Sequence, residues 1–573
     1  MKSNGRKMVI RCAAAFLCLW AGMANAQDFS NIGNQKPFGF NGGLEMRGIF
    51  YNASGIANRR EPFTYLFSGS PTASIYSWSI PFSFTLSRDD RSFRQPFNQF
   101  GLSPTYKWLT IHAGYRNVTF SPYTLAGHTM LGGGFELNPG KFRLGFMYGR
   151  LNRATVIDTT TQSLAPFSFS RKGLAAKVGY GTASTYLDLH LLHAKDNSDS
   201  QPDFPLADEV NVLPAANSVV GYGAKVSLFS KIFLESDGAL SVYTNDINSP
   251  ITFDSIADGT LRRLGGLMDV NGTTEWFYAF SAGVGYKAKY YGLKANYRRV
   301  QPDFKSMGAY FFANDVENVT LSPQFALPNG KVRVNASVGI QKDNVNLQKE
   351  ATNRRIIASG TVGAEFTERL GVDLMYSNFS NNQRPNTLRF ADSLKIVQTT
   401  QTLSVMPRYT IVGERAMHMV MLSVNISSMN DYNGYFGDTA PSRDISTGQY
   451  LVNYSISLPQ KRISLFSSLS HTALNSADNK TSYNGVSLGG NYSLESQKMK
   501  MGLNSSLMQG DANGNKSLII NGSANMSYVI NKLQSIRFSF FLTRNNPGSV
   551  VTGLSPAFTE SRGELAYQFN FGL

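Results

Sequence analysis

The sequence has two cysteines, Cys12 and Cys18, and both lie within residues 1–26. This segment has a basic start, a short apolar stretch and the small-x-small site Ala24-Asn25-Ala26, which are the parts of a secretory signal. The apolar stretch is too short to cross a bilayer, which needs about 20 apolar residues. We therefore expect cleavage between Ala26 and Gln27. The mature chain then has no thiol, which excludes disulfides, zinc–thiolate sites and cysteine nucleophiles.

Long hydrophobic runs and catalytic motifs are missing as well. The mean hydropathy is −0.20, and no segment after the signal is a candidate transmembrane helix. The sequence has no HExxH, and it has no nucleophile elbow or phosphate loop in the strand–helix context those motifs need. His190 and His193 are three residues apart, so they would lie on opposite faces of a strand and could not chelate one metal as a pair. We expect no enzymatic activity, no metal site and no cofactor.

Positive charge is in excess but never concentrated. The chain has 54 Lys and Arg against 38 Asp and Glu, a net charge of +16. After the signal these charges stand singly or in adjacent pairs among polar and aromatic residues, with no longer basic run. A nucleic-acid-binding protein would gather them in a patch or run, so no nucleic-acid partner is expected.

What the sequence does have is alternation. Between Lys141 and Leu151, apolar and aromatic side chains occupy every second position, and Pro139-Gly140-Lys141 precedes them as a turn. The same pattern flanks Pro328-Asn329-Gly330, between Asn318 and Lys342. A period of two over nine or more residues indicates β-strands rather than helix. Twelve per cent aromatic residues and 52 glycines agree with a chain made of strands.

The pattern continues from near Phe40 to Leu573 and predicts about 26 strands, within a range of 24–28. Short turns alternate with longer polar loops, as in barrels with short periplasmic turns and long extracellular loops. We predict an all-β fold, a single large transmembrane antiparallel β-barrel. Its domains are a cleaved signal peptide (1–26), a short periplasmic N-terminal segment (27–38) and the barrel (39–573). A soluble solenoid or propeller is disfavoured because no consensus repeats at a fixed offset.

Aromatic residues suggest how the barrel meets the membrane. Trp78 and Trp108 fall beside predicted periplasmic turns, where an aromatic girdle is expected, although ordinary turn packing is the alternative. The final strand places aromatic and apolar side chains at alternate positions up to the terminus. It resembles the signal read by the barrel-assembly machinery, with Tyr567, Phe569, Phe571 and Leu573 as its residues.

The stripe opposite the apolar one should face the lumen, and its charges are mostly basic. The candidate lumen-lining cations are Arg116, Arg143, Lys177, Lys225, Lys287, Lys294, Arg298, Arg333, Lys500 and Arg537. A pore lined by cations favours anions. The alternative is that these cations pair with acidic residues in a plugged interior. Both interpretations stay open at this point.

Two loops stand out by their length and composition. Thr119–His128 is followed by three glycines, and Gln301–Asp315 contains several aromatic residues. Such loops fold into a barrel, bind partners or pack on each other.

Two stretches carry a resemblance, Gly127–Arg150 and Tyr297–Tyr310. They look like uncharacterised, porin-like outer-membrane β-barrel proteins of the Bacteroidota. The resemblance implies a barrel in the outer membrane of a Gram-negative bacterium. It supplies no substrate and no functional residues.

Two functions remain as hypotheses. The first is a porin-like or transport channel for small solutes, with an anion preference. The alternative is a structural or accessory barrel that partners an outer-membrane secretion or envelope-assembly complex. The expected partners are outer-membrane lipid, the barrel-assembly machinery and other outer-membrane or periplasmic proteins. Both termini are expected in the periplasm.

Overall fold

The computed structural model describes residues 37–76, 78–87, 99–154, 168–200, 212–251, 270–309, 313–349, 351–385, 396–431, 444–477, 479–494, 497–548 and 556–572. The expected cleavage site at Ala26 and Gln27 lies outside these residues, as do most of the expected N-terminal segment and Leu573.

Antiparallel strands make up almost all of the described chain. They are β1 (Phe38–Ser54), β2 (Phe63–Gly69), β3 (Thr72–Ile75), β4 (Trp78–Ser87), β5 (Gln99–Leu102), β6 (Thr105–Tyr106), β7 (Leu109–Asn117), β8 (Thr129–Leu137), β9 (Phe142–Asn152), β10 (Ser170–Gly181), β11 (Tyr186–Asn197), β12 (Ala216–Leu228), β13 (Ile232–Thr244), β14 (Thr274–Lys287), β15 (Tyr291–Val300), β16 (Val316–Ala326), β17 (Val332–Lys342), β18 (Ala351–Glu365), β19 (Leu370–Pro385), β20 (Ile396–Val412), β21 (Met417–Asp431), β22 (Ile445–Leu458), β23 (Ile463–Ser476), β24 (Asn479–Ser493), β25 (Met499–Ala512), β26 (Asn515–Asn531), β27 (Gln534–Pro547) and β28 (Phe558–Gly572). No helix among the described residues is long and apolar enough to cross a membrane.

Prolines divide two of the barrel strands into pieces. β2 and β3 keep one register against β1 on either side of Pro71, and β5 and β6 keep one register against β7 on either side of Pro104. Proline has no N–H to donate, so it interrupts the hydrogen-bond ladder without shifting it. The 28 pieces therefore form 26 barrel strands, as the sequence predicted.

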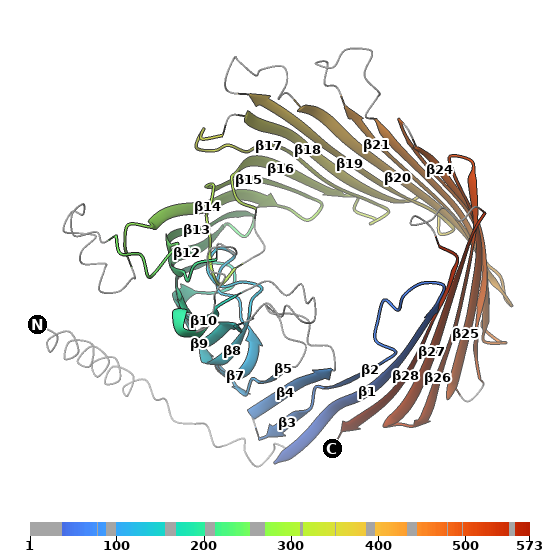
Figure 1. The fold of residues 1–573 in the computed structure, drawn as a ribbon, viewed down its shortest axis with the longest axis horizontal. Coiled ribbons are helices and arrows are strands. Elements are labelled where there is room, and N and C mark those ends of the chain that lie inside the picture. Colours follow the sequence, from blue (N-terminus) through green and yellow to red (C-terminus); the bar gives the residue numbers. More distant parts are fainter. Residues whose placement is uncertain are drawn as a thin grey trace, which may run out of the picture.

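The barrel closes between its first and last strands, which lie side by side in Figure 1. β1 pairs with β28 from Asn41 opposite Gly572 to Ser54 opposite Thr559. The rings of Phe40 and Phe571 stack at 4.6 Å beside this seam. A closed sheet has no free edge, so its backbone groups are satisfied between strands.

The two ends of the barrel differ in their connections. Tight turns, such as those at 138–141, 182–185 and 327–331, share one end with Phe38 and Gly572; we call it the short-turn end. Most connections at the other, long-loop end are longer. Two exceptions there are short, between β23 and β24 and between β25 and β26. Twelve turns were expected, near residues 77, 108, 140, 183, 230, 290, 329, 368, 413, 460, 497 and 531. All coincide with a connection at the short-turn end, although residue 77 itself is not described.

Alternation separates an outward face from an inward one. On β11, Leu187 and Leu189 are 56% and 58% exposed, whereas Asp188 between them is 3% exposed. The same contrast recurs around the ring, so exposed apolar side chains form an outer belt while polar ones point inward. An apolar belt around a closed antiparallel ring is the outer-membrane β-barrel type.

Candidate functional site: the barrel interior

Two connections from the long-loop end fold onto the inner wall, and we call residues 118–128 and 301–309 the inner plug. Figure 1 shows them on the inner side of the ring beside β10 and β12. They also contact each other: the Ala126 N–H donates to the Gly308 carbonyl at 2.9 Å, and Ser306 Oγ donates to the Thr124 carbonyl at 2.7 Å. The predicted loops therefore both fold inward and pack together. Residues 310–312 lie outside the description.

Polar side chains of the wall hold the second plug segment. Asn217 on β12 accepts a hydrogen bond from the Met307 N–H at 3.0 Å. Its amide nitrogen donates to Ser241 Oγ on β13 at 2.8 Å, and Ser241 Oγ donates to the Lys305 carbonyl at 2.6 Å. All three contacts are buried or partly buried, so they fix the backbone of this segment against two strands.

Apolar side chains complete the attachment. Tyr123 meets Phe304 edge to face at 6.0 Å, and Phe304 is fully buried. Phe120 lies over Gly145 of β9, where an added Cβ would approach the ring to 2.8 Å. In the part of the chain that the structure describes, the buried apolar cluster draws all its members from residues 118–316. The plug therefore rests on the β8–β16 side of the barrel.

Lumenal cations on this side are paired. Arg143 forms an ion pair with Asp188 at 3.2 Å and stacks over Tyr186 at 4.4 Å. Similar pairs join Lys177 to Glu136 at 3.9 Å, Lys294 to Glu235 at 2.5 Å and Lys225 to Glu235 at 4.0 Å. These four predicted residues therefore contribute little uncompensated charge.

The other predicted cations differ in their surroundings. Arg116 donates to Ser83 Oγ at 3.0 Å, and Arg298 reaches the Ala313 carbonyl at 3.5 Å. The remaining members of the predicted set lie at exposed, inward-facing positions with no ion pair to another described residue: Lys287, Arg333, Lys500 and Arg537.

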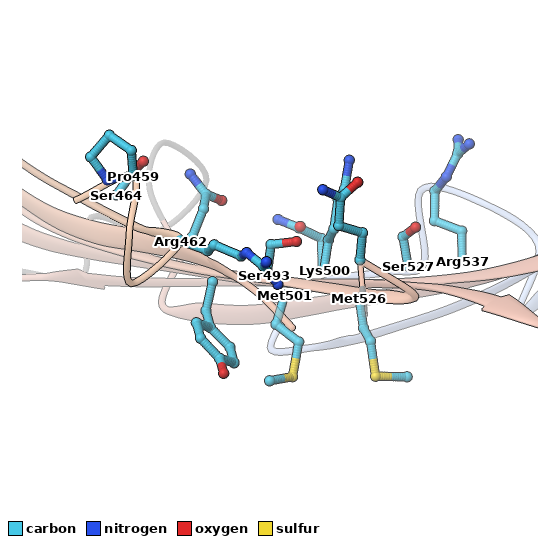
Figure 2. Close-up of a pocket in the computed structure, with 13 residues that line it drawn as sticks. Pro459, Arg462, Ser464, Ser493, Lys500, Met501, Met526, Ser527 and Arg537 are labelled. Atoms are coloured by element: carbon cyan, nitrogen blue, oxygen red, sulfur yellow. The ribbon is translucent and has the colours of Figure 1, made fainter. Parts of the chain in front are cut away.

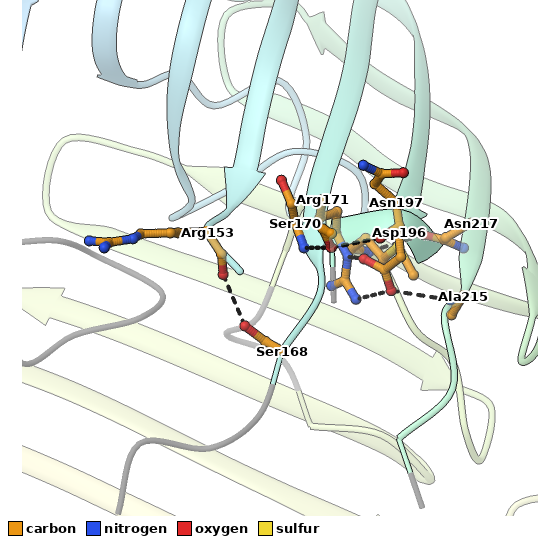
Figure 3. A network of polar contacts seen from close by, with 10 residues as sticks. Arg153, Ser168, Ser170, Arg171, Asp196, Asn197, Ala215 and Asn217 are labelled. Atoms are coloured by element: carbon orange, nitrogen blue, oxygen red, sulfur yellow. Dashed lines mark hydrogen bonds and ion pairs between the residues drawn. The ribbon is translucent and has the colours of Figure 1, made fainter. Parts of the chain in front are cut away.

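A further polar network ties the plugged wall together at the long-loop end, and sequence reasoning missed it (Figure 3). Arg171 on β10 donates twice to Asp196 on β11, at 2.8 and 3.0 Å. The same carboxylate accepts from the Ala215 N–H at 3.1 Å. Asp196 is buried, and a bidentate guanidinium–carboxylate pair there is strong and directional. No sequence motif indicates the strand register that places Arg171 opposite Asp196.

The aromatic candidates lie at the short-turn end. Trp78 stacks on Tyr106 at 5.1 Å, and Trp108 is exposed. Trp276, which was not among the predicted girdle residues, lies near the start of β14 at the opposite end and is 66% exposed. On β28, Tyr567 and Phe569 share the outward stripe with Phe571.

Among the described residues, no three potential metal ligands gather in one place. His112 is held between Ser103 Oγ at 3.0 Å and Glu136 at 3.1 Å. It therefore serves the network around Glu136 and Lys177.

No family model and no curated protein matches the chain. Among solved structures, the FrpB iron transporter of Neisseria meningitidis (F5-1 variant) has a TM-score of 0.36 at 10% identity, covering 92% of this chain and 82% of its own. The P pilus usher PapC translocation pore scores 0.35 at 11% identity, covering 93% and 99%. OccAB2 of Acinetobacter baumannii scores 0.31 at 9% identity, covering 62% and 92%.

Proposed function

We propose that the chain is a channel for small hydrophilic solutes in the outer membrane of a Gram-negative bacterium, with its short-turn end in the periplasm. The observation that carries the proposal is the one-sided plug. The described plug residues rest against β8–β16, whereas the inward side chains of β17–β28 are mostly polar and solvent-accessible. A polar, solvent-accessible wall beside a plug that covers only part of the barrel supports a water-filled passage.

Liposome swelling tests this proposal. The purified barrel should admit neutral sugars, and a variant with residues 120–126 replaced by a short Gly-Ser linker should admit larger ones. Swelling by neither protein, with both correctly folded by circular dichroism, would contradict the channel.

The unpaired inward cations support an anion preference. Lys500 and Arg537 lie on the open side, and neither forms an ion pair with a described residue. Uncompensated cations on a lumen wall raise the local anion concentration. Reversal potentials under a salt gradient should therefore show selectivity for chloride over potassium. K500Q combined with R537Q should reduce it, whereas R544Q, on the opposite face of β27, should not.

One observation favours a second candidate, an accessory barrel whose open side is filled by another envelope protein. A barrel of 26 strands is wide, and the described plug covers part of its wall. Purification in mild detergent distinguishes the two. A stoichiometric partner together with no solute flux supports the accessory role, and flux through the purified barrel alone supports the channel.

A further inference from the structure

The inward wall of β22–β28 carries a row of cations that differs from the paired charges near the plug. Ser493 on β24 pairs with Lys500 on β25, Lys500 pairs with Ser527 on β26, and Ser527 pairs with Arg537 on β27. Arg462 joins the row through its carbonyl, which accepts from the Ser493 N–H at 3.1 Å. Each cation is therefore two strands from the next, or about 10 Å. Small serines between them leave space for long side chains and a bound solute.

Figure 2 shows which way these residues point. Lys500, Ser527 and Arg537 extend to one side of the sheet, and Met501 and Met526 extend to the other. The polar side lines a shallow hollow of about 750 Å³. None of the described residues that line it carries a carboxylate. Arg462 donates to the Leu494 carbonyl at 3.2 Å and forms no ion pair with another described residue.

A second row, of amides, runs beside the cations. Gly502 pairs with Asn491 on one side and Asn525 on the other. A Cβ at Gly502 would lie 2.6 Å from Asn491 Oδ1 and 2.8 Å from Asn525 Oδ1, so the glycine lets the two amides converge over it. Gly502 is two residues from Lys500, so this row lies about 7 Å along the strand from the cations.

We propose that this hollow binds small phosphorylated sugars. The proposal rests on the proposed channel function, with sugar phosphates as one class of solute that the channel carries. Guanidinium and ammonium groups bind phosphate through charge-assisted hydrogen bonds. Asparagine amides both donate to and accept from hydroxyls. A solute with a phosphate at one end and a hydroxylated body of sugar size matches the two rows, with the phosphate between Lys500 and Arg537 and the ring over Gly502.

Isothermal titration of the intact, detergent-solubilised barrel with glucose 6-phosphate tests the site without requiring conduction. Glucose 6-phosphate should bind more tightly than inorganic phosphate, and glucose should bind most weakly. K500Q and R537Q should each weaken glucose 6-phosphate about tenfold, the loss expected for one charge-assisted contact. K516Q and R544Q, whose residues face outward, are the matched controls and should bind like the unchanged protein.

The amide row has its own readout. N525A should weaken glucose 6-phosphate and leave inorganic phosphate unchanged, whereas N335A, an inward asparagine on β17, should change neither. Equal affinity for phosphate and glucose 6-phosphate, or full binding by K500Q and R537Q, would overturn the sugar-phosphate site. A barrel that binds glucose 6-phosphate but carries no current would overturn the channel and keep the site.

Discussion

Asn217 on β12 accepts a hydrogen bond from the backbone N–H of Met307, 90 residues further along the chain, at 3.0 Å. The same side chain donates to Ser241 Oγ and to the Val242 carbonyl, so one buried amide joins two strands and the plug.

Replacing this amide should loosen the plug. N217A removes three hydrogen bonds and leaves buried groups without partners, at about 1–3 kcal/mol for each group left unsatisfied. We expect larger or more frequent openings in single-channel recordings and faster proteolysis of residues 301–309. N335A provides the matched control, since Asn335 is exposed on the inward face of β17. Recordings from N217A that match those from N335A would show that Asn217 does not hold the plug.

Replacing Gly145 with even the smallest side chain, that of alanine, should destabilise the barrel. A methyl group in G145A would lie 2.8 Å from the Phe120 ring, which is packed into the buried cluster and has little room to move. Overpacking of this kind costs about 1–3 kcal/mol. We expect a lower thermal unfolding temperature in detergent. G292A is the comparison, because its nearest neighbour would be at an ordinary 3.4 Å and its stability should be almost unchanged.

The buried pair of Arg143 and Asp188 should be costly to break. Asp188 is almost fully enclosed, so D188A leaves a partly buried guanidinium without its carboxylate. Loss of one member of a buried pair costs about 3–5 kcal/mol. The double variant D188A/R143A should be less destabilised than the sum of the two single variants. Strict additivity in urea unfolding would show that the two charges do not interact.

Acid should release the outer attachment of the second loop. Burial raises the pKa of the Asp315 carboxyl, but the Lys349 ammonium, 2.5 Å away, and the N–H groups of Val345 and Asn344 lower it further, so the pKa lies below its usual value. The bond to Asp315 in turn raises the pKa of Lys349.

Asp315 adds stability above its unfolded pKa of about 3.9 and loses it as the pH falls through the lower folded value. Lys349 adds stability below about 10.4 and loses it as the pH rises through its higher folded value. The single-channel conductance should therefore be higher at pH values below about 3.9 than at neutral pH. D315N should show the higher conductance under both conditions. The same acid response in D315N would exclude this carboxylate as the cause.

Much of the barrel could be predicted from local pattern. Alternation such as Phe142, Leu144, Phe146 and Tyr148 against Arg143 and Gly145 predicts both the strand and its two faces, because a strand repeats every two residues. Turn residues such as Pro139 and Gly140 predict the hairpins and hence the number of strands. Pro71 and Pro104 each interrupt a strand. The two pieces on either side of each proline keep the same register against the neighbouring strand, so the alternation continues across the break.

The interior could not be predicted in the same way. The sequence identifies Lys177, Lys294, Lys500 and Arg537 alike as inward cations, because each stands opposite an apolar stripe. Which of them finds a carboxylate depends on the register between strands and on where the loops fold. Lys294 meets Glu235 across two strand boundaries, and Phe120 reaches Gly145 only because its loop turns inward. Side-chain alternation is a local property, so the strands, their two faces and the barrel can be predicted from the sequence. Charge pairing and the one-sided plug arise from contacts between residues that are far apart in the chain, so they become visible once the chain is folded.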